Sequence, residues 1–211
     1  MEHQNTAREK ILKKVRNALL SPTENPYNHV DFEADLYDYK EDLDVLFAQQ
    51  FNLNGGQFIY CENPKDFTVQ LDELRKAKGW EKIQIVDEDL VSLFDKCSFK
   101  QFKITTDDEK SLANLSLCEG LIARTGSIIV SSEQKESKLF HYQTDHLLFV
   151  ASIKHITSNL QLAMKQLEEK YHRLPADLSV ISGVDQLEYH YNSKGPGIFG
   201  PKEIYLFLID K

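Results

Sequence analysis

From residue 43 onward, segments with helical spacing of apolar residues alternate with short apolar runs typical of strands. A helix is predicted over 64–78, because Asn63-Pro64 forms a start signal and Gly79 a C-terminal exit. Strands are predicted on either side of it, at 57–61 and 82–86. Successive strand-helix-strand units have right-handed crossovers and therefore parallel strands. We expect an α/β fold whose mostly parallel sheet is flanked by helices on both faces.

The second half of the chain continues this pattern with one change of rhythm. Two short apolar runs lie within 121–130 around a central Gly126, which predicts a tight turn or hairpin in which this glycine has positive φ. A short helix and a longer helix complete the expected helices, at 87–94 and 157–171. Further strands are predicted at 102–104, 147–150, 178–181 and 204–209.

The first forty residues differ in character from the rest of the chain. Thr6 to Glu9 has the form of a capping box, and apolar residues then mark one face of a helix that Pro22 ends. Residues 31–44 carry seven carboxylates against one lysine, which is typical of a solvated arm; a cation or partner site is the alternative. We expect residues 1–40 to form an N-terminal helix and acidic arm, and residues 41–211 a single α/β domain.

Composition excludes several classes of function. The formal charge is -8, which argues against a nucleic-acid partner because phosphate binding needs a clustered positive surface. The sequence contains neither a run long enough to span a membrane nor a basic-then-apolar signal, so we expect a cytoplasmic protein without a membrane partner. Three cysteines without CxxC spacing predict reduced thiols, and we expect no metal site and no cofactor in this chain.

Candidate ligand-binding residues gather in three glycine-bearing turns, each next to an apolar run. Glycine lets backbone amides approach a ligand, and ligands of open α/β sheets bind beyond the strand ends. We therefore expect a small anionic ligand at these turns, and each turn has a plain connector as its alternative. Arg124 is a candidate clamp for a carboxylate, with a solvated or ion-paired arginine as the alternative. The candidate residues are Arg124, Thr125, Gly126, Ser127, Ser182, Gly183, Gly197, Gly200, Pro201 and Lys202.

Four segments in this order resemble the lactate-utilisation (LUD) domain family. They are residues 8–19, the Ile-Ala-Arg-Thr-Gly-Ser-Ile-Ile-Val run at 122–130, residues 181–183, and Gly-Ile-Phe-Gly-Pro-Lys at 197–202. The resemblance implies a fold similar to the sugar-phosphate isomerase and CoA-transferase group. It also implies a role beside iron-sulfur subunits that oxidise L-lactate to pyruvate in bacteria, with the clusters in those partner subunits.

The chain departs from the family pattern at positions that matter for chemistry. Arg124 stands where the family has an acidic residue, Ser127 replaces a threonine, and Phe199 occupies a histidine position. Loss of an acid and a histidine removes obvious groups for proton transfer. Three functions stay open: a non-redox accessory subunit of lactate oxidation, a free-standing enzyme on a small phosphorylated or CoA-linked acid, and a non-catalytic binding or scaffold module.

Overall fold

A computed structural model describes residues 7–20, 42–85, 87–104, 111–134, 144–183 and 201–210. The chain divides into two compact units, Met1–Asp38 and Tyr39–Lys211. The first unit contains helix α1 (Ala7–Leu20), which confirms the predicted N-terminal helix. Its predicted cap at Thr6, the stop at Pro22 and most of the acidic arm lie outside the described residues.

The second unit is built on a six-stranded sheet in the order β1-β10-β7-β4-β2-β3. Every pairing in it is parallel, as the alternation of helices and strands predicts. The last described strand, β10, lies inside the sheet between the edge strand β1 and β7. The strands are β1 (Gln57–Cys61), β2 (Ile83–Ile85), β3 (Phe102–Ile104), β4 (Ser111–Leu117), β7 (Thr144–Ser152) and β10 (Glu203–Ile209).

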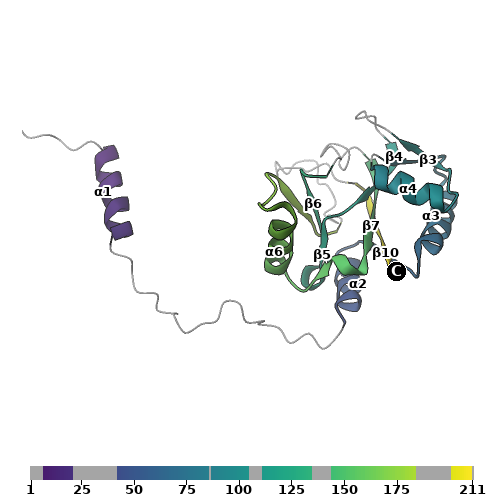
Figure 1. Ribbon diagram of the computed structural model, residues 1–211, viewed down its shortest axis with the longest axis horizontal. Coiled ribbons are helices and arrows are strands. Elements are labelled where there is room, and N and C mark those ends of the chain that lie inside the picture. Colours follow the sequence, from purple (N-terminus) through teal and green to yellow (C-terminus); the bar gives the residue numbers. More distant parts are fainter. Residues whose placement is uncertain are drawn as a thin grey trace, which may run out of the picture. The chain divides into compact units, whose positions relative to one another are not determined.

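Two helices cover one face of this sheet, α3 (Pro64–Lys78) and α4 (Glu88–Lys96) (Figure 1). The Asn63 side chain accepts hydrogen bonds from the first-turn amides of α3, and Gly79 ends the helix in the left-handed conformation. Phe67 of α3 and Phe94 of α4 stack with ring centroids 6.1 Å apart. These rings join the apolar side chains of the sheet in one buried core.

The other face packs against helix α2 (Leu43–Leu53) and a second, four-stranded sheet in the order β8-β5-β6-β9. Its strands are β5 (Gly120–Ile122), β6 (Ser127–Ser131), β8 (Ile156–Thr157) and β9 (Leu178–Ile181). The antiparallel pairing of β5 with β6 confirms the predicted hairpin. Two 3₁₀ turns belong to this region, η1 (Ala123–Thr125) and η2 (Ile153–His155).

Helix α6 (Leu160–Tyr171) covers the outer face of the second sheet. Ala163 and Leu167 of α6 are buried against Ile122 and Ile129 of β5 and β6. In Figure 1, α6 and the α3–α4 pair lie on opposite sides of the two sheets. The sequence pattern predicts the α/β class and the parallel sheet, but it does not predict the second sheet as a separate layer.

Candidate functional site

Two of the three predicted turns meet at one end of the second sheet. Thr125 and Gly126 follow β5, Ser127 opens β6, and Ser182 follows β9. Because β6 is antiparallel to both β5 and β9, its first residue lies beside the last residues of those two strands. Strand order therefore brings the hydroxyl side chains of Thr125 and Ser127 together with that of Ser182, which is 57 residues after Thr125 in the sequence. We call these three residues the hydroxyl cluster.

A chain of hydrogen bonds links the hydroxyl cluster. Ser127 Oγ donates to Thr125 Oγ1 at 2.6 Å and lies 2.7 Å from Ser182 Oγ. Either serine can donate in the second bond; when the one hydrogen of Ser127 points to Thr125, Ser182 is that donor and the Thr125 hydrogen is left for another acceptor. Ser127 is fully buried, whereas Thr125 and Ser182 are exposed. The cluster thus presents the Thr125 hydroxyl as a donor at the surface.

Gly126 and Gly183 fix this cluster against the end of helix α2. Both have positive φ, +59° and +88°, which agrees with the positive φ predicted for Gly126. A Cβ on Gly126 would lie 2.3 Å from Phe51 N, and one on Gly183 would lie 2.1 Å from Asn54 O. The Asn54 side-chain amide donates to Thr125 O at 2.8 Å. Close backbone approach, as well as conformation, therefore requires glycine at both turns.

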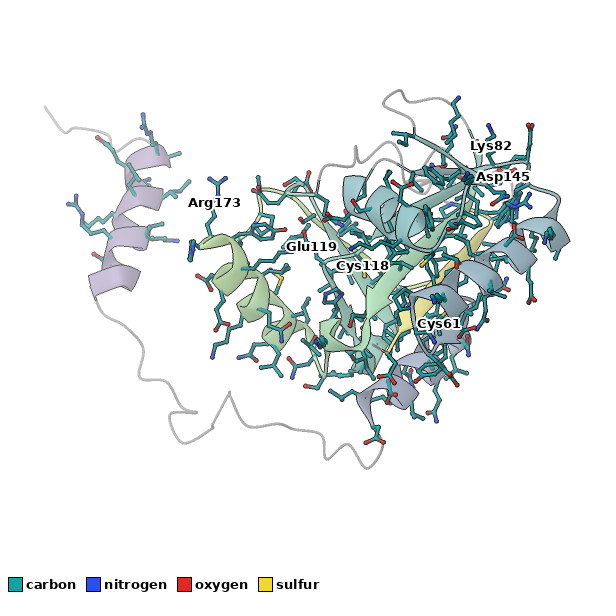
Figure 2. The ribbon with its side chains drawn as sticks, turned by 45° about the vertical axis from the view of Figure 1, so that its right-hand side comes forward. Cys61, Lys82, Cys118, Glu119, Asp145 and Arg173 are labelled. Carbon is teal, nitrogen blue, oxygen red and sulfur yellow. The ribbon has the colours of Figure 1, made fainter. Side chains whose placement is uncertain are left out.

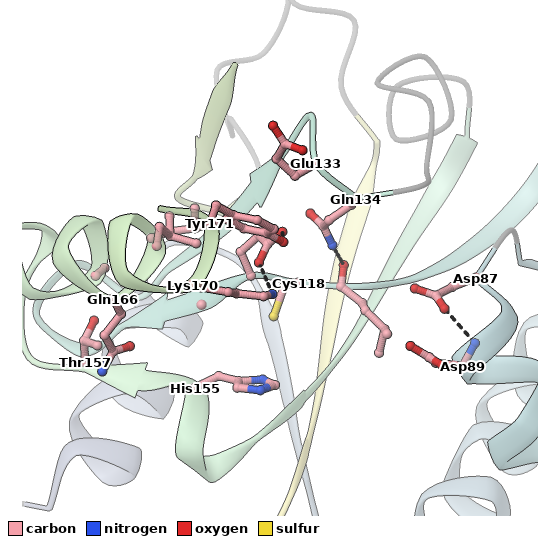
Figure 3. A pocket seen from close by; sticks show the side chains of 16 residues that line it. Asp87, Asp89, Cys118, Glu133, Gln134, His155, Thr157, Gln166, Lys170 and Tyr171 are labelled. Carbon is pink, nitrogen blue, oxygen red and sulfur yellow. Dashed lines mark hydrogen bonds and ion pairs between the residues drawn. The ribbon is translucent and has the colours of Figure 1, made fainter. Parts of the chain in front are cut away.

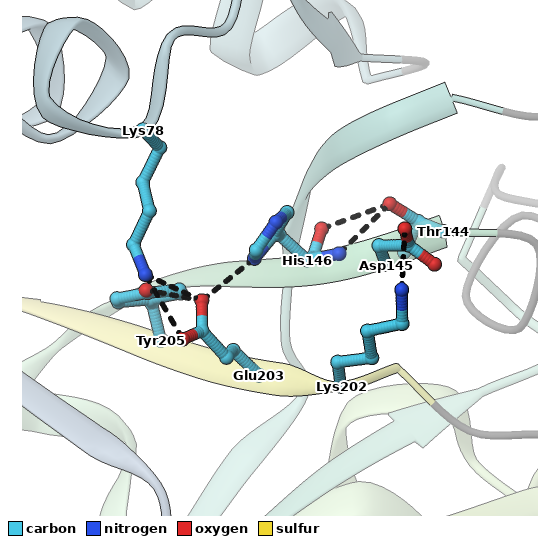
Figure 4. Close-up of polar contacts among 7 residues, drawn as sticks. All are labelled: Lys78, Thr144, Asp145, His146, Lys202, Glu203 and Tyr205. Carbon is cyan, nitrogen blue, oxygen red and sulfur yellow. Dashed lines mark hydrogen bonds and ion pairs between the residues drawn. The ribbon is translucent and has the colours of Figure 1, made fainter.

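The remaining predicted residues lie in different places. Arg124 is exposed, and its backbone amide donates to Ser158 O at 3.2 Å. Gly197 and Gly200 lie outside the described residues. Pro201 is half-buried, and Lys202 Nζ pairs with Asp145 Oδ2 at 3.1 Å just before β10 (Figure 4). A common site for all three turns therefore stays a prediction.

A polar network beside Lys202 joins the amino ends of β7 and β10 to α3 (Figure 4). Glu203 accepts from Lys78 Nζ at 2.8 and 2.9 Å and from Tyr205 OH at 2.7 Å. His146 Nδ1 lies 2.8 Å from the same carboxylate. Burial alone would raise the pKa of Glu203, but Lys78 and Tyr205 lower it below its ordinary value. We assign this network a structural role, holding three elements together.

A cavity of about 440 Å³ lies at the carboxyl edge of the parallel sheet, between the strand ends and α6 (Figure 3). Its lining includes Leu117 at the end of β4, Gly120 at the start of β5, Asp87 after β2 and Lys170 of α6. The carboxyl edge is where open α/β sheets bind ligands. The hydroxyl cluster lies at the other end of β6, where Ser127 is roughly 14 Å from Ser131 at about 3.4 Å of rise per residue. The hydroxyl cluster and the cavity are therefore distinct regions.

Glu119 anchors one wall of this cavity. Its side chain is 1% exposed and accepts from Ser131 Oγ at 2.8 Å, Tyr171 OH at 2.7 Å and Lys170 Nζ at 2.7 Å. Burial would raise the pKa of Glu119, but hydrogen bonds from these three donors outweigh it, and the pKa falls below its ordinary value. The carboxylate therefore stays charged and fixes the positions of Lys170 and Tyr171. Figure 2 shows Glu119 beside α6, with Cys61 elsewhere in the molecule.

His155 reaches the cavity from η2. Its Nδ1 accepts from the Ser152 amide at 3.4 Å, which leaves the proton of the neutral ring on Nε2. Loss of solvent around the ring, and then the charge of Lys170, lower the pKa of His155 below its ordinary value. His155 is therefore a neutral N–H donor at pH 7.

Sequence reasoning missed the cavity, including Glu119, His155 and Lys170. The sequence does contain one indication of this site. At Cys118-Glu119-Gly120, an alternating strand pattern ends in a carboxylate that is followed by a glycine. Among the described residues, no group of three histidine, cysteine or acidic side chains could hold a metal ion. In the part of the chain that the structure describes, none of the helices has the length and apolarity needed to cross a membrane.

Two comparisons with known proteins found a match, one to a family model and one to a solved structure. The family model described as LUD domain matches residues 45–209, nearly the whole second unit. A DUF162 family protein from Deinococcus radiodurans has a similar structure, with a TM-score of 0.56 and 15% sequence identity. The similarity covers 79% of this chain and 96% of that protein. No curated protein matches the sequence.

Proposed function

Because this chain belongs to the LUD domain family, we propose that it is a non-redox accessory component of a bacterial system that oxidises L-lactate to pyruvate. In this proposal it works in the cytoplasm, binds a small anionic ligand at the hydroxyl cluster and associates with iron-sulfur subunits. Family membership supports the link to lactate utilisation. The ligand and the partners are inferences of our own.

The outward hydroxyl of Thr125 is the observation that carries the ligand-binding part of the proposal. The hydrogen bonds from Ser182 through Ser127 to Thr125 run in one direction, so each polarises the next and strengthens the last donor. The C-terminal end of α2 lies beside the cluster and carries partial negative charge. An anion at the cluster therefore needs a compensating cation, and Arg124, the residue before Thr125, carries a positive charge.

Thr125 variants test the anion site. Thr125→Val keeps the shape of the side chain and removes its donor, whereas Thr125→Ser keeps the donor. We expect L-lactate or pyruvate to raise the melting temperature of the unsubstituted protein and of Thr125→Ser. Their affinity for Thr125→Val should be at least threefold weaker, because a hydrogen bond of about 1 kcal/mol is lost. Equal binding by all three proteins would refute the site.

Association with partners is tested separately. The full chain, tagged and purified from a bacterium that grows on lactate, should carry cysteine-rich iron-sulfur polypeptides with it. Their absence under conditions of active lactate oxidation would contradict the accessory role. If Thr125→Val still associates with the iron-sulfur polypeptides, then assembly of the complex does not depend on ligand binding at the hydroxyl cluster.

A free-standing enzyme is the second candidate, and the cavity at the carboxyl edge favours it. A cavity of about 440 Å³ is large enough for a small substrate. Its lining includes Asp87, Asp89 and Glu133, whose carboxylates repel phosphorylated or CoA-linked acids. Turnover of such an acid by the isolated chain would overturn both the accessory role and this electrostatic argument.

A further inference from the structure

The carboxyl-edge cavity has two polar walls of different character (Figure 3). Lys170, Tyr171 and His155 lie on one side, and Asp87 and Asp89 lie on the other. The two walls come from different elements, because the first belongs to α6 and η2 and the second to the start of α4. A ligand that spans the cavity therefore meets donors at one end and acceptors at the other.

Lys170 is held in place and still has donors to offer. Its Nζ bonds to Glu119 at 2.7 Å and lies 4.8 Å from the centre of the Tyr171 ring. An ammonium group has three N–H donors, and the contacts with Glu119 and Tyr171 leave at least one for a ligand. The Lys170 side chain is 57% exposed, whereas that of Glu119 is 1% exposed. The buried carboxylate thus aligns a cation whose other side faces accessible space.

His155 adds a neutral donor to the same wall. The bond from the Ser152 amide to Nδ1 directs the ring proton to Nε2. Lys170 contributes to keeping the ring neutral through its charge. Lys170 and His155 together can donate to a carboxylate, because one supplies a positive charge and the other an N–H group.

The opposite wall consists of two carboxylates at the start of α4. Asp87 Oδ1 accepts the Asp89 amide at 2.7 Å, which orients the Asp87 side chain. Each carboxylate has two oxygens and about four acceptor positions, so one backbone bond leaves most of the capacity of Asp87 for a ligand. The lining also includes the apolar side chains of Leu117, Ile129 and Leu167. This surface suits a short hydrocarbon chain.

We propose that the carboxyl-edge cavity binds a small zwitterion, with its ammonium group at Asp87 and Asp89 and its carboxylate at Lys170 and His155. A simple anion would face repulsion from the two aspartates and from Glu133. A simple cation would be repelled by Lys170 and would offer no acceptor to His155 or to the remaining donor of Lys170. This site is independent of the proposed anion site, which lies at the other end of β6, and either proposal can fail without the other.

A matched set of four compounds tests the ligand class on the full chain. The set is 6-aminohexanoate, hexylamine, hexanoate and 1-hexanol, which share one carbon chain and differ in their end groups. We expect 6-aminohexanoate to raise the melting temperature by about 3 °C at ten times its dissociation constant, and the other three to have less effect at equal concentration. Equal stabilisation by hexylamine, stronger stabilisation by hexanoate, or no effect of any compound would overturn the proposal.

Charge-neutral variants test the position of the ammonium group. Asparagine remains a good N-cap, so Asp87→Asn removes the charge and keeps the start of α4 intact. We expect Asp87→Asn and Asp89→Asn each to weaken binding of 6-aminohexanoate about tenfold by calorimetry, because a charge-assisted hydrogen bond is lost. Asp95→Asn is the control, since this exposed aspartate of α4 is not part of the cavity lining. Unchanged affinity in both cavity variants, or an equal loss in Asp95→Asn, would refute this binding mode.

Discussion

Glu119 shows how one buried side chain can organise a polar wall. Its three donors lie 12, 51 and 52 residues away in sequence, on β6 and α6. No local pattern links residues at such separations, so the Cys118-Glu119-Gly120 step can indicate the end of a strand in the sequence but not the cavity that these residues line. The prediction for Gly126 succeeded because its evidence is local, a glycine between two short apolar runs that pair as a hairpin.

We predict that Glu119→Gln lowers the free energy of unfolding by about 1 to 3 kcal/mol at pH 7, because the charged acceptor of three hydrogen bonds is lost. The folded-state pKa of Glu119 lies below its ordinary value of 4.5. Its stabilising contribution is therefore complete above pH 4.5 and is lost as the pH falls through the folded-state pKa. Urea denaturation from pH 7 downward should show the difference between the two proteins shrinking only in this acid range.

Glu133→Gln is the matched control for this measurement. Glu133 pairs with Arg173 at 3.5 Å, and the Arg173 side chain is 77% exposed. A pair of this kind contributes roughly 0 to 1 kcal/mol. The lowered pKa of Glu119 would be contradicted if the free energies of unfolding of Glu119→Gln and of the unsubstituted protein differed by the same amount at every pH.

Elements with strong end signals were predicted best. Helix α3 has its predicted bounds, 64–78, because Asn63, Pro64 and Gly79 specify both ends locally. Strand β4 was not predicted, since Asn114 and Ser116 interrupt its apolar pattern although both are buried in the structure. In the sequence, these two polar residues look like the residues of a strand that face solvent. Burial of these side chains depends on the layers packed around β4, which local sequence does not specify.

At the scale of elements, we predict that the contact between α2 and η1 tolerates no side chain at Gly126. Gly126→Ala should lower the free energy of unfolding by about 3 to 5 kcal/mol, because a left-handed conformation and a clash with the backbone at Phe51 add together. Gly79→Ala is the control, since Gly79 has φ of +71° and nothing within 4 Å of an added Cβ. It should cost only about 1 to 2 kcal/mol. If urea denaturation shows the same loss of unfolding free energy for Gly126→Ala and Gly79→Ala, then α2 can move away from the turn.

At the scale of the whole molecule, we predict that residues 39–211 fold by themselves. This unit contains all three buried apolar cores and the whole LUD domain match. A chain starting at Tyr39 should unfold in a single cooperative transition, with a melting temperature within about 2 °C of the full chain. A large drop in melting temperature would instead show that residues 1–38 are needed for stability.

The position of β10 between β1 and β7 governs the order in which the sheet can form during synthesis. β1 and β7 have no direct pairing and are joined only through β10, whose residues 203–209 are translated after both of them. Until these residues leave the ribosome, β1 lacks the strand that it pairs with in the parallel sheet, and one edge of β7 stays unpaired. Chaperone protection during this interval, and slow closure once it ends, follow from the strand order alone.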